Sequence, residues 1–146
     1  MKNKNLTIGI DAGKHTGIAI FENNNLIELK SLNTYQTIYF IQQNADRIKC
    51  IVIEDSTQQS YIWGADQMNR KSFGRRARNT GSVDGKLDVY KEMCKELKIE
   101  VIPISPLKKG KKWTHAEFKV YFPEYKGTTN QHERDAVKCV VVMDFC

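Results

Sequence analysis

The stretch Thr7–Phe21, TIGIDAGKHTGIAIF, decides the fold of this 146-residue chain. It lies across two apolar segments that have the character of strands, Leu6–Ala12 and Thr16–Glu22, with a short polar turn between them. A turn of three asparagines leads to a third segment, Leu26–Leu32, in which apolar and polar residues alternate. Three strands joined by such short turns predict an antiparallel meander.

Helical and strand patterns alternate after this meander. The spacing of apolar residues predicts helices over residues 34–46, 83–97, 114–122 and 131–145. Two strands are predicted between them, Ile48–Glu54 and Ile99–Ile104, and the first is continuously apolar, as expected of a strand covered on both faces. Residues 58–81 show no clear period, and Lys108–Lys112 has the character of a basic loop. We therefore expect one α/β domain over residues 1–146, a mixed five-stranded sheet flanked by helices.

Charge and cysteine usage indicate where the protein works and what it binds. The net charge of +6 at pH 7 favours a polyanionic partner without identifying one. The four cysteines form no CxxC pair, so we expect free thiols in a reducing compartment and no zinc site. The polar N-terminus does not resemble a signal peptide, and no run approaches the roughly 18 apolar residues of a membrane span. These features predict a cytoplasmic protein.

Carboxylates stand at the ends of two apolar strands. Asp11 ends the first predicted strand, and Glu54 ends the most apolar one. A carboxylate in such a place carries a desolvation cost unless it is paired or bound to a metal. Functional sites in open sheets form at the carboxyl ends of strands, and Asp11 and Glu54 would meet there if their strands are neighbours.

The last predicted helix supplies further candidates. Asn130 followed by Glu133 is a capping-box pattern that would start this helix. His132 and Asp135 lie three residues apart and therefore face the same way. Hard cations such as Mg²⁺ and Mn²⁺ are the simplest way to hold several carboxylates at one point. Two such ions roughly 3.5–4 Å apart can activate a water and stabilise the leaving oxygen of a phosphodiester.

These stretches together resemble the RuvC family of Holliday junction resolvases, which have the RNase H-like fold. The opening stretch is similar to the family's first strand and hairpin. IVIEDS (Ile51–Ser56) resembles the family's fourth strand, and HERDAVKCVV (His132–Val141) resembles its last helix. The resemblance implies two Mg²⁺ ions, replaceable by Mn²⁺, with no organic cofactor. The catalytic and metal-binding residues that it implies are Asp11, Glu54, His132 and Asp135.

The same resemblance implies a partner and a reaction. Members of the family act as homodimers that nick two opposed strands of a four-way DNA junction and leave 5′-phosphate ends, in DNA recombination and repair. This chain is short for a cellular member, and its length is compatible with a compact phage-type protein acting in the host cytoplasm. His132 could bind metal or orient the attacking water, and the sequence does not decide between these roles.

Two segments are candidates for contacts with branched DNA. The first combines basic side chains, which could hold phosphates, with aromatic side chains, which could stack on unpaired bases. Its members are Tyr61, Trp63, Arg70, Lys71, Phe73, Arg75, Arg76 and Arg78. The second is the lysine run beside Trp113: Lys108, Lys109, Lys111 and Lys112.

Each candidate also has an ordinary structural interpretation. Asp11 could be a turn residue, and Glu54 could pair with a basic neighbour. His132 could merely start its helix, and Asp135 could lie on the surface. The basic segments could be solvated loops and their aromatic residues part of the core. Strand alternation places Asp55 on the face opposite Glu54, where we expect it to be solvated.

Other functions remain open on the sequence alone. The Asp-x-Gly hairpin also resembles the phosphate loop of actin and the sugar kinases, but those proteins need two such domains and a second glycine-rich loop. A broader branched-DNA or flap nuclease, or an RNase H-type nuclease, would use the same carboxylates. A catalytically inactive module that only binds branched DNA would not need a metal.

Overall fold

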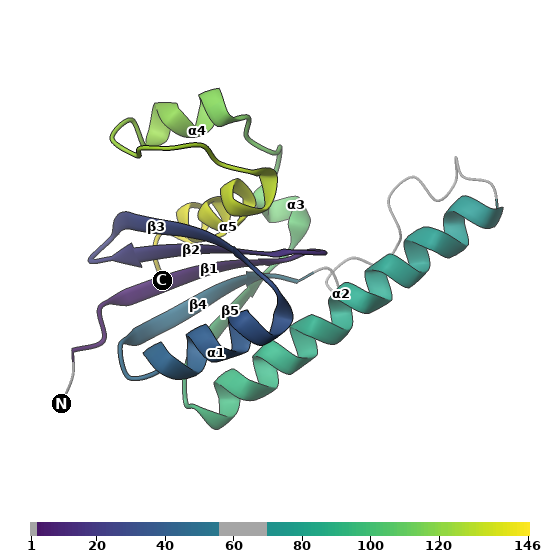
Figure 1. The fold of residues 1–146 in the computed structure, drawn as a ribbon, viewed down its shortest axis with the longest axis horizontal. Coiled ribbons are helices and arrows are strands. Elements are labelled where there is room, and N and C mark those ends of the chain that lie inside the picture. The colour runs from purple at the N-terminus through teal and green to yellow at the C-terminus, as the bar shows by residue number, and fades with distance from the viewer. Residues whose placement is uncertain (1–2, 56–69) are drawn as a thin grey trace.

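In the computed structural model, which describes residues 3–55 and 70–146, a five-stranded mixed sheet forms the centre of the fold (Figure 1). The antiparallel meander is present as predicted, and the other two strands continue the sheet in parallel, β4 beside β1 and β5 beside β4. The order across the sheet is β3-β2-β1-β4-β5. The strands are β1 (Leu6–Ala12), β2 (Thr16–Glu22), β3 (Asn25–Leu32), β4 (Ile48–Glu54) and β5 (Glu100–Ile104).

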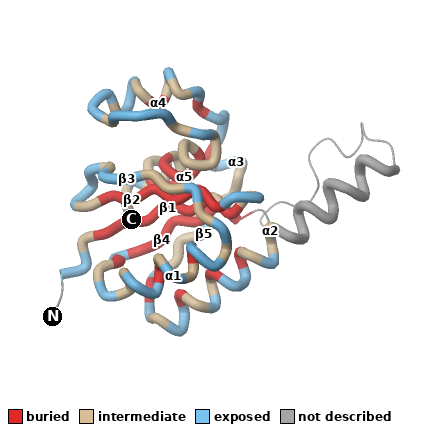
Figure 2. The backbone as a smooth tube through the Cα atoms, viewed as in Figure 1, coloured by how far each residue is buried: buried red, intermediate tan, exposed pale blue. Residues whose placement is uncertain are grey.

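Helices cover both faces of the sheet, so β1, β2 and β4 are buried between two layers, whereas no residue of β3 is buried (Figure 2). On one face, α1 (Thr34–Asn44) and α2 (Arg70–Glu96) pack on a cluster of strand residues through Ile41, Leu87 and Tyr90. On the other face lies α5 (Gln131–Val142), accompanied by the short helices α3 (Pro106–Lys109) and α4 (His115–Tyr121). Within the described ranges, no helix combines the length and the apolar character that crossing a membrane requires.

The pleat of the strands decides which side chains face α5. Ile8 and Ile10 of β1 belong to the core under α1 and α2, so Asp11 points to the opposite face, toward α5. In β4, Val52 belongs to the core under α5, and Glu54 shares that face with it. Because β1 and β4 are hydrogen-bonded neighbours, the two carboxylates emerge at the same edge of the sheet.

Two glycines allow α5 to lie directly on the sheet. A Cβ atom at Gly9 would stand 2.1 Å from the carbonyl oxygen of Ala136, and one at Gly17 would stand 2.1 Å from that of His132. Any side chain at either position would therefore collide with the backbone of α5. The helix can approach β1 and β2 this closely only because both residues lack a Cβ.

Several element boundaries differ from those predicted. Helix α2 begins at Arg70 rather than at residue 83, because the polar and basic sequence before Val83 carries no apolar period by which a helix could be recognised. The predicted basic loop Lys108–Lys112 is partly helical: the Ser105 hydroxyl accepts a hydrogen bond from the Leu107 amide and caps α3. Helix α5 ends at Val142 instead of residue 145.

The expectation of four free thiols is wrong for one pair. Cys50 and Cys146 form a disulfide, with Cα atoms 6.8 Å apart. Cys50 lies on the α5 face of β4, and the chain after α5 turns back over β2, where Phe145 packs edge-on against Phe21 with ring centres 5.2 Å apart. This return path is not visible in the local sequence. Cys94 and Cys139 are free and buried.

Substituting Gly17 by alanine should destabilise the fold by about 1–3 kcal/mol, because the new methyl group would have to displace the backbone of α5. Urea unfolding would measure the change in free energy. Gly85→Ala is the matched control: Gly85 is exposed within α2 and a Cβ there meets nothing within 4 Å, so alanine should stabilise the helix by about 0.5–1 kcal/mol. Equal unfolding free energies for the wild type and Gly17→Ala would contradict the close approach of α5.

Candidate active site

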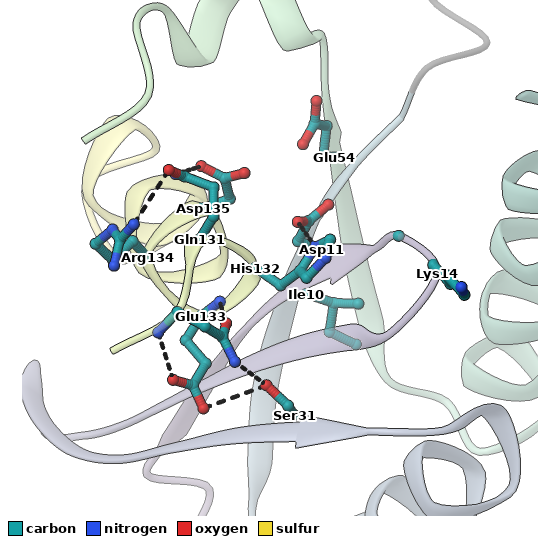
Figure 3. A network of polar contacts seen from close by, with 12 residues as sticks. Ile10, Asp11, Lys14, Ser31, Glu54, Gln131, His132, Glu133, Arg134 and Asp135 are labelled. Carbon is teal, nitrogen blue, oxygen red and sulfur yellow. Dashed lines mark hydrogen bonds and ion pairs between the residues drawn. The ribbon is translucent and has the colours of Figure 1, made fainter. Parts of the chain in front are cut away.

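A pocket of about 240 Å³ opens at the carboxyl ends of β1 and β4, beside the first turn of α5. The structure brings together here the four residues that the sequence predicts as catalytic (Figure 3): Asp11, Glu54, His132 and Asp135. The remaining lining residues are Ala12, Gly13, Val83 and Lys112. Residues far apart in the sequence thus share one small volume.

The start of α5 is fixed by a hydrogen-bonded cap, which sets the position of His132 and Asp135. The side chain of Asn130 accepts from the Glu133 amide at 2.9 Å, and the Glu133 carboxylate accepts from the Asn130 amide at 3.0 Å. Asn130 also donates to the hydroxyl of Ser31 at 2.6 Å, which ties this cap to β3. The predicted capping box is therefore confirmed.

His132 and Asp11 form the first polar pair of the site. Nδ1 of His132 lies 3.2 Å from Oδ2 of Asp11. The hydrogen bond to Asp11 raises the pKa of His132 above its ordinary value, although partial burial acts in the opposite direction. Gly13 leaves room for the ring, since a Cβ there would stand 2.8 Å from Cε1 of His132.

A buried lysine supplies positive charge to the carboxylates. The side chain of Lys109 is only 3% exposed, and its ammonium group forms an ion pair with Glu54 and lies 3.9 Å from Oδ2 of Asp135. Burial raises the pKa of Glu54, and the charge of Lys109 opposes this rise. Burial alone would lower the pKa of Lys109, but neighbouring acidic groups, Cys139 first and then Glu54, Asp11 and Asp135, raise it above its ordinary value. The lysine is therefore charged and serves as the counter-ion of the cluster.

This position of Lys109 differs from the exposed, DNA-contacting one that the sequence predicts for it. Since α3 forms where a loop was expected, its last residue turns inward beneath α5. The other three residues of the run, Lys108, Lys111 and Lys112, are exposed as a phosphate contact requires. Nζ of Lys112 lies 3.8 Å from Oδ2 of Asp135, at the rim of the pocket.

The donor set has the chemistry that Mg²⁺ and Mn²⁺ prefer, because three carboxylates with little exposure to water line one pocket. As the side chains stand, no three histidine, cysteine or acidic residues of the described ranges are close enough together to enclose a metal ion. Glu54 is instead paired with the ammonium group of Lys109, which supplies positive charge where a metal ion otherwise would. The types of side chain present fit a metal ion. To bind one, Glu54 would have to give up its ion pair with Lys109.

The first predicted DNA-binding segment is described only in part. Tyr61 and Trp63 lie outside the described residues. The rest of the segment lies in the first half of α2, so its backbone is helical where the sequence shows no helical period. The side chains of these residues lie outside what the structure describes: Arg70, Lys71, Phe73, Arg75, Arg76 and Arg78.

Asp55 is buried, so the expectation that it is solvated is wrong. Strand β4 ends at Glu54, and beyond it the chain turns Asp55 under α2, where Nζ of Lys91 lies 2.5 Å from its Oδ2. Alternation along a strand predicts the side on which a residue lies but not what covers that side. Asp55 and Lys91 thus join β4 to α2 next to the pocket.

The sequence also did not reveal how α2 supports the turn between β1 and β2. Nζ of Lys86 donates to the carbonyl oxygens of Gly13 and Lys14, at 3.0 and 3.1 Å. The Tyr90 hydroxyl lies 2.9 Å from the hydroxyl of Thr16. Tyr90 is recognisable as a core residue by its helical spacing, but nothing in the sequence distinguishes Lys86 from other surface lysines. These contacts steady the turn that carries Gly13 beneath the ring of His132.

Comparison with solved structures gives the fold a precedent. The chain superimposes on a Thermus thermophilus RuvC structure in complex with a Holliday junction substrate, with a TM-score of 0.62, 13% sequence identity and coverage of 96% of this chain and 93% of that one. The chain has the RuvC fold. A second Thermus thermophilus RuvC structure matches with a TM-score of 0.53 at 10% identity over the same shares of both chains.

The RuvC fold accounts for the element order and for the mixed sheet that the sequence predicts. No protein-family model matches the chain, and no curated protein is similar to it in sequence. The match to RuvC is therefore one of backbone architecture, and at these identities it establishes the fold alone.

The pKa of His132 should fall in Asp11→Asn, because an amide in place of the carboxylate removes the negative charge and weakens the hydrogen bond to the imidazole. Titration of the ring resonances by NMR would measure this, with His115, which contacts Thr129 instead, as the internal reference. The raised pKa means that the contact stabilises the fold fully below the ordinary pKa of 6.5, and this contribution is lost as the pH rises through the folded-state pKa. An unchanged titration in the variant would contradict the pairing.

Proposed function

We propose that the chain is a metal-dependent endonuclease that resolves four-way DNA junctions. The observation that carries this proposal is the convergence of Asp11, Glu54 and Asp135, from three separate elements, in one pocket of a RuvC fold. The related structure contains RuvC in complex with a Holliday junction substrate, which supports branched DNA as the substrate. On this proposal residues 1–146 act as one nuclease domain.

In the proposed mechanism, Asp11, Glu54 and Asp135 hold two Mg²⁺ ions, for which Mn²⁺ can substitute. Such ions would supply Lewis acidity and would lower the pKa of the attacking water, so that it loses a proton and becomes a stronger nucleophile. To hold them, Glu54 would give up its ion pair with Lys109, whose ammonium group would remain beside the pocket as a positive charge. His132, held by Asp11, stands at the edge of the pocket, where it could bind metal or orient the attacking water.

The substrate's backbone would be held by basic side chains around the pocket. Lys112 lies at the rim, and Lys108 and Lys111 are exposed nearby in the sequence. The arginines of the first predicted segment remain candidates for further phosphate contacts. Resolution of a junction needs two nicks, one in each of two opposed strands, so we propose a homodimer that brings one pocket to each strand and leaves 5′-phosphate ends. Such an enzyme would act in recombination, in repair or in the clearing of branches before genome packaging, and the sequence does not decide between them.

A second candidate function is a module that binds branched DNA without cutting it. Lys109 favours this candidate, because it already neutralises Glu54 without a metal. The nuclease remains the better account, since a metal-free module has no evident use for three carboxylates with so little exposure in one pocket. Binding without cleavage would be the result that separates them.

Wild-type protein should cut a synthetic four-way junction into paired nicks when Mg²⁺ or Mn²⁺ is present. Asp11→Asn and Glu54→Gln should lower the cleavage rate more than about a hundredfold, beyond the loss expected from a residue that only supports a ligand. Both variants should still bind the junction in EDTA, because neither residue holds the DNA backbone.

Linear duplex and an RNA–DNA hybrid serve as the comparison substrates. Equal cutting of either one would point to a broader branched-DNA or RNase H-type nuclease with the same pocket. A wild-type protein that binds the junction tightly but leaves it intact with every divalent metal would contradict the proposal and favour the binding module.

A further inference from the structure

The carboxylate of Asp135 accepts a hydrogen bond from Gln131, which is itself hydrogen-bonded to Arg134 on the same helix. Nε2 of Gln131 donates to Oδ1 of Asp135 at 2.9 Å, and Oε1 of Gln131 accepts from Nη2 of Arg134 at 3.2 Å (Figure 3). The spacing of these residues, three and four apart, places them side by side on one face of α5. They form a chain of hydrogen bonds that runs from Arg134 through Gln131 to Asp135, and we call this chain the relay.

Arg134 is itself fixed from several directions. Its Nε donates to the carbonyl oxygen of Trp113 at 2.8 Å, and its Nη1 donates to the carbonyl oxygen and the hydroxyl of Thr129, at 2.8 and 2.9 Å. Trp113 and Thr129 stand at the two ends of the segment that contains α4. The guanidinium group therefore has a single orientation, set by backbone atoms outside α5.

This fixed guanidinium decides which way round the amide of Gln131 lies. Arginine has only donors, so it must face the amide oxygen of Gln131, and the amide NH₂ is then left facing Asp135. Without Arg134, the amide could rotate and present its oxygen to the carboxylate, which would repel it. Arg134 thus acts on Asp135 through Gln131.

A neutral donor is suited to a carboxylate that has to bind a cation. The amide of Gln131 restrains one oxygen of Asp135 without adding a positive charge of its own, whereas an arginine placed directly there would compete with a metal. The other oxygen, Oδ2, lies toward Lys109 and Lys112, on the pocket side. The side chain of Asp135 is 4% exposed, so water offers little alternative restraint.

We propose that Gln131 and Arg134 are positioning residues that orient Asp135 for metal binding. This inference rests on the proposed function, since it assigns the two residues to the same metal site. It predicts that their loss weakens metal binding specifically, without weakening the binding of DNA.

The first test is Gln131→Met, which keeps an unbranched side chain of helical preference but removes both hydrogen bonds. The Mn²⁺ concentration that half-saturates the protein, measured by electron paramagnetic resonance without DNA, should rise about tenfold or more. The Mn²⁺ dependence of single-turnover junction cleavage should shift by the same factor. The junction dissociation constant in EDTA should stay as in the wild type.

Val140→Ala is the matched control on the same helix. Val140 is buried over Gly9 and has no polar contact with the pocket, so its truncation should lower the melting temperature and leave the half-saturating Mn²⁺ concentration unchanged. If Val140→Ala weakened Mn²⁺ binding as much as Gln131→Met does, a general loosening of α5 would explain both, and the inference would be overturned.

Arg134→Met supplies an independent check on the direction of the relay. It should weaken Mn²⁺ binding in the same sense and lower the melting temperature more, because the segment from Trp113 to Thr129 loses its tether. The double variant with Gln131→Met should bind Mn²⁺ no more weakly than Gln131→Met alone, since Arg134 acts only through Gln131. Additive effects of the two substitutions would contradict the relay.

The inference and the proposed function fail in different ways. If the wild type binds Mn²⁺ and cuts junctions while Gln131→Met matches it in both, the relay is overturned and the nuclease stands. If the wild type neither binds Mn²⁺ nor cuts, the proposed function is overturned and the relay falls with it.

Discussion

The close approach of α5 to the sheet is the constraint on which the candidate site depends. Gly9 and Gly17 have no side chains, so the carbonyl groups of Ala136 and His132 can lie directly against β1 and β2. A helix held at the usual distance by intervening side chains would lift its first turn away from the strand ends. The hydrogen-bonded cap at Asn130 then decides which residues stand in that turn. Packing and capping together bring acidic side chains from different elements into one pocket.

The three carboxylates in the pocket repel one another, and the surrounding residues reduce this repulsion or restrain the side chains. Carboxylates with little exposure to water are unfavourable unless they have cationic or hydrogen-bonding partners. Lys109 stabilises Glu54, His132 stabilises Asp11, and Gln131 restrains Asp135. The partners differ in their effect on charge: the lysine neutralises the carboxylate of Glu54, whereas the amide of Gln131 orients the carboxylate of Asp135 without neutralising it. On the proposed function, this division would stabilise the cluster without a metal and leave Asp135 able to bind one.

The sequence predicts much of this arrangement because its strongest signals are local. Apolar strands that end in carboxylates, as at Asp11 and Glu54, predict both the sheet and the edge at which the pocket lies. The capping box predicts the start of α5 and hence the placement of His132 and Asp135. All of these patterns lie within a few residues along the chain.

The features that the sequence does not predict come from contacts between distant segments. The burial of Asp55 depends on Lys91, and the inward turn of Lys109 depends on where α3 packs, although the serine-proline start of that helix was a visible signal. The sequence does not predict the early start of α2, because the part of this helix before Val83 has no apolar stripe and so gives no period to detect. The disulfide of Cys50 with Cys146 depends on the path of the chain after α5.

The most direct test of the central claim is diffraction from crystals grown with Mn²⁺, using its anomalous signal to locate the ions. We expect anomalous density in the pocket beside Asp11, Glu54 and Asp135, with the ammonium group of Lys109 moved away from Glu54. Crystals saturated with Mn²⁺ that show no density there, and in which Lys109 still pairs with Glu54, would contradict the claim.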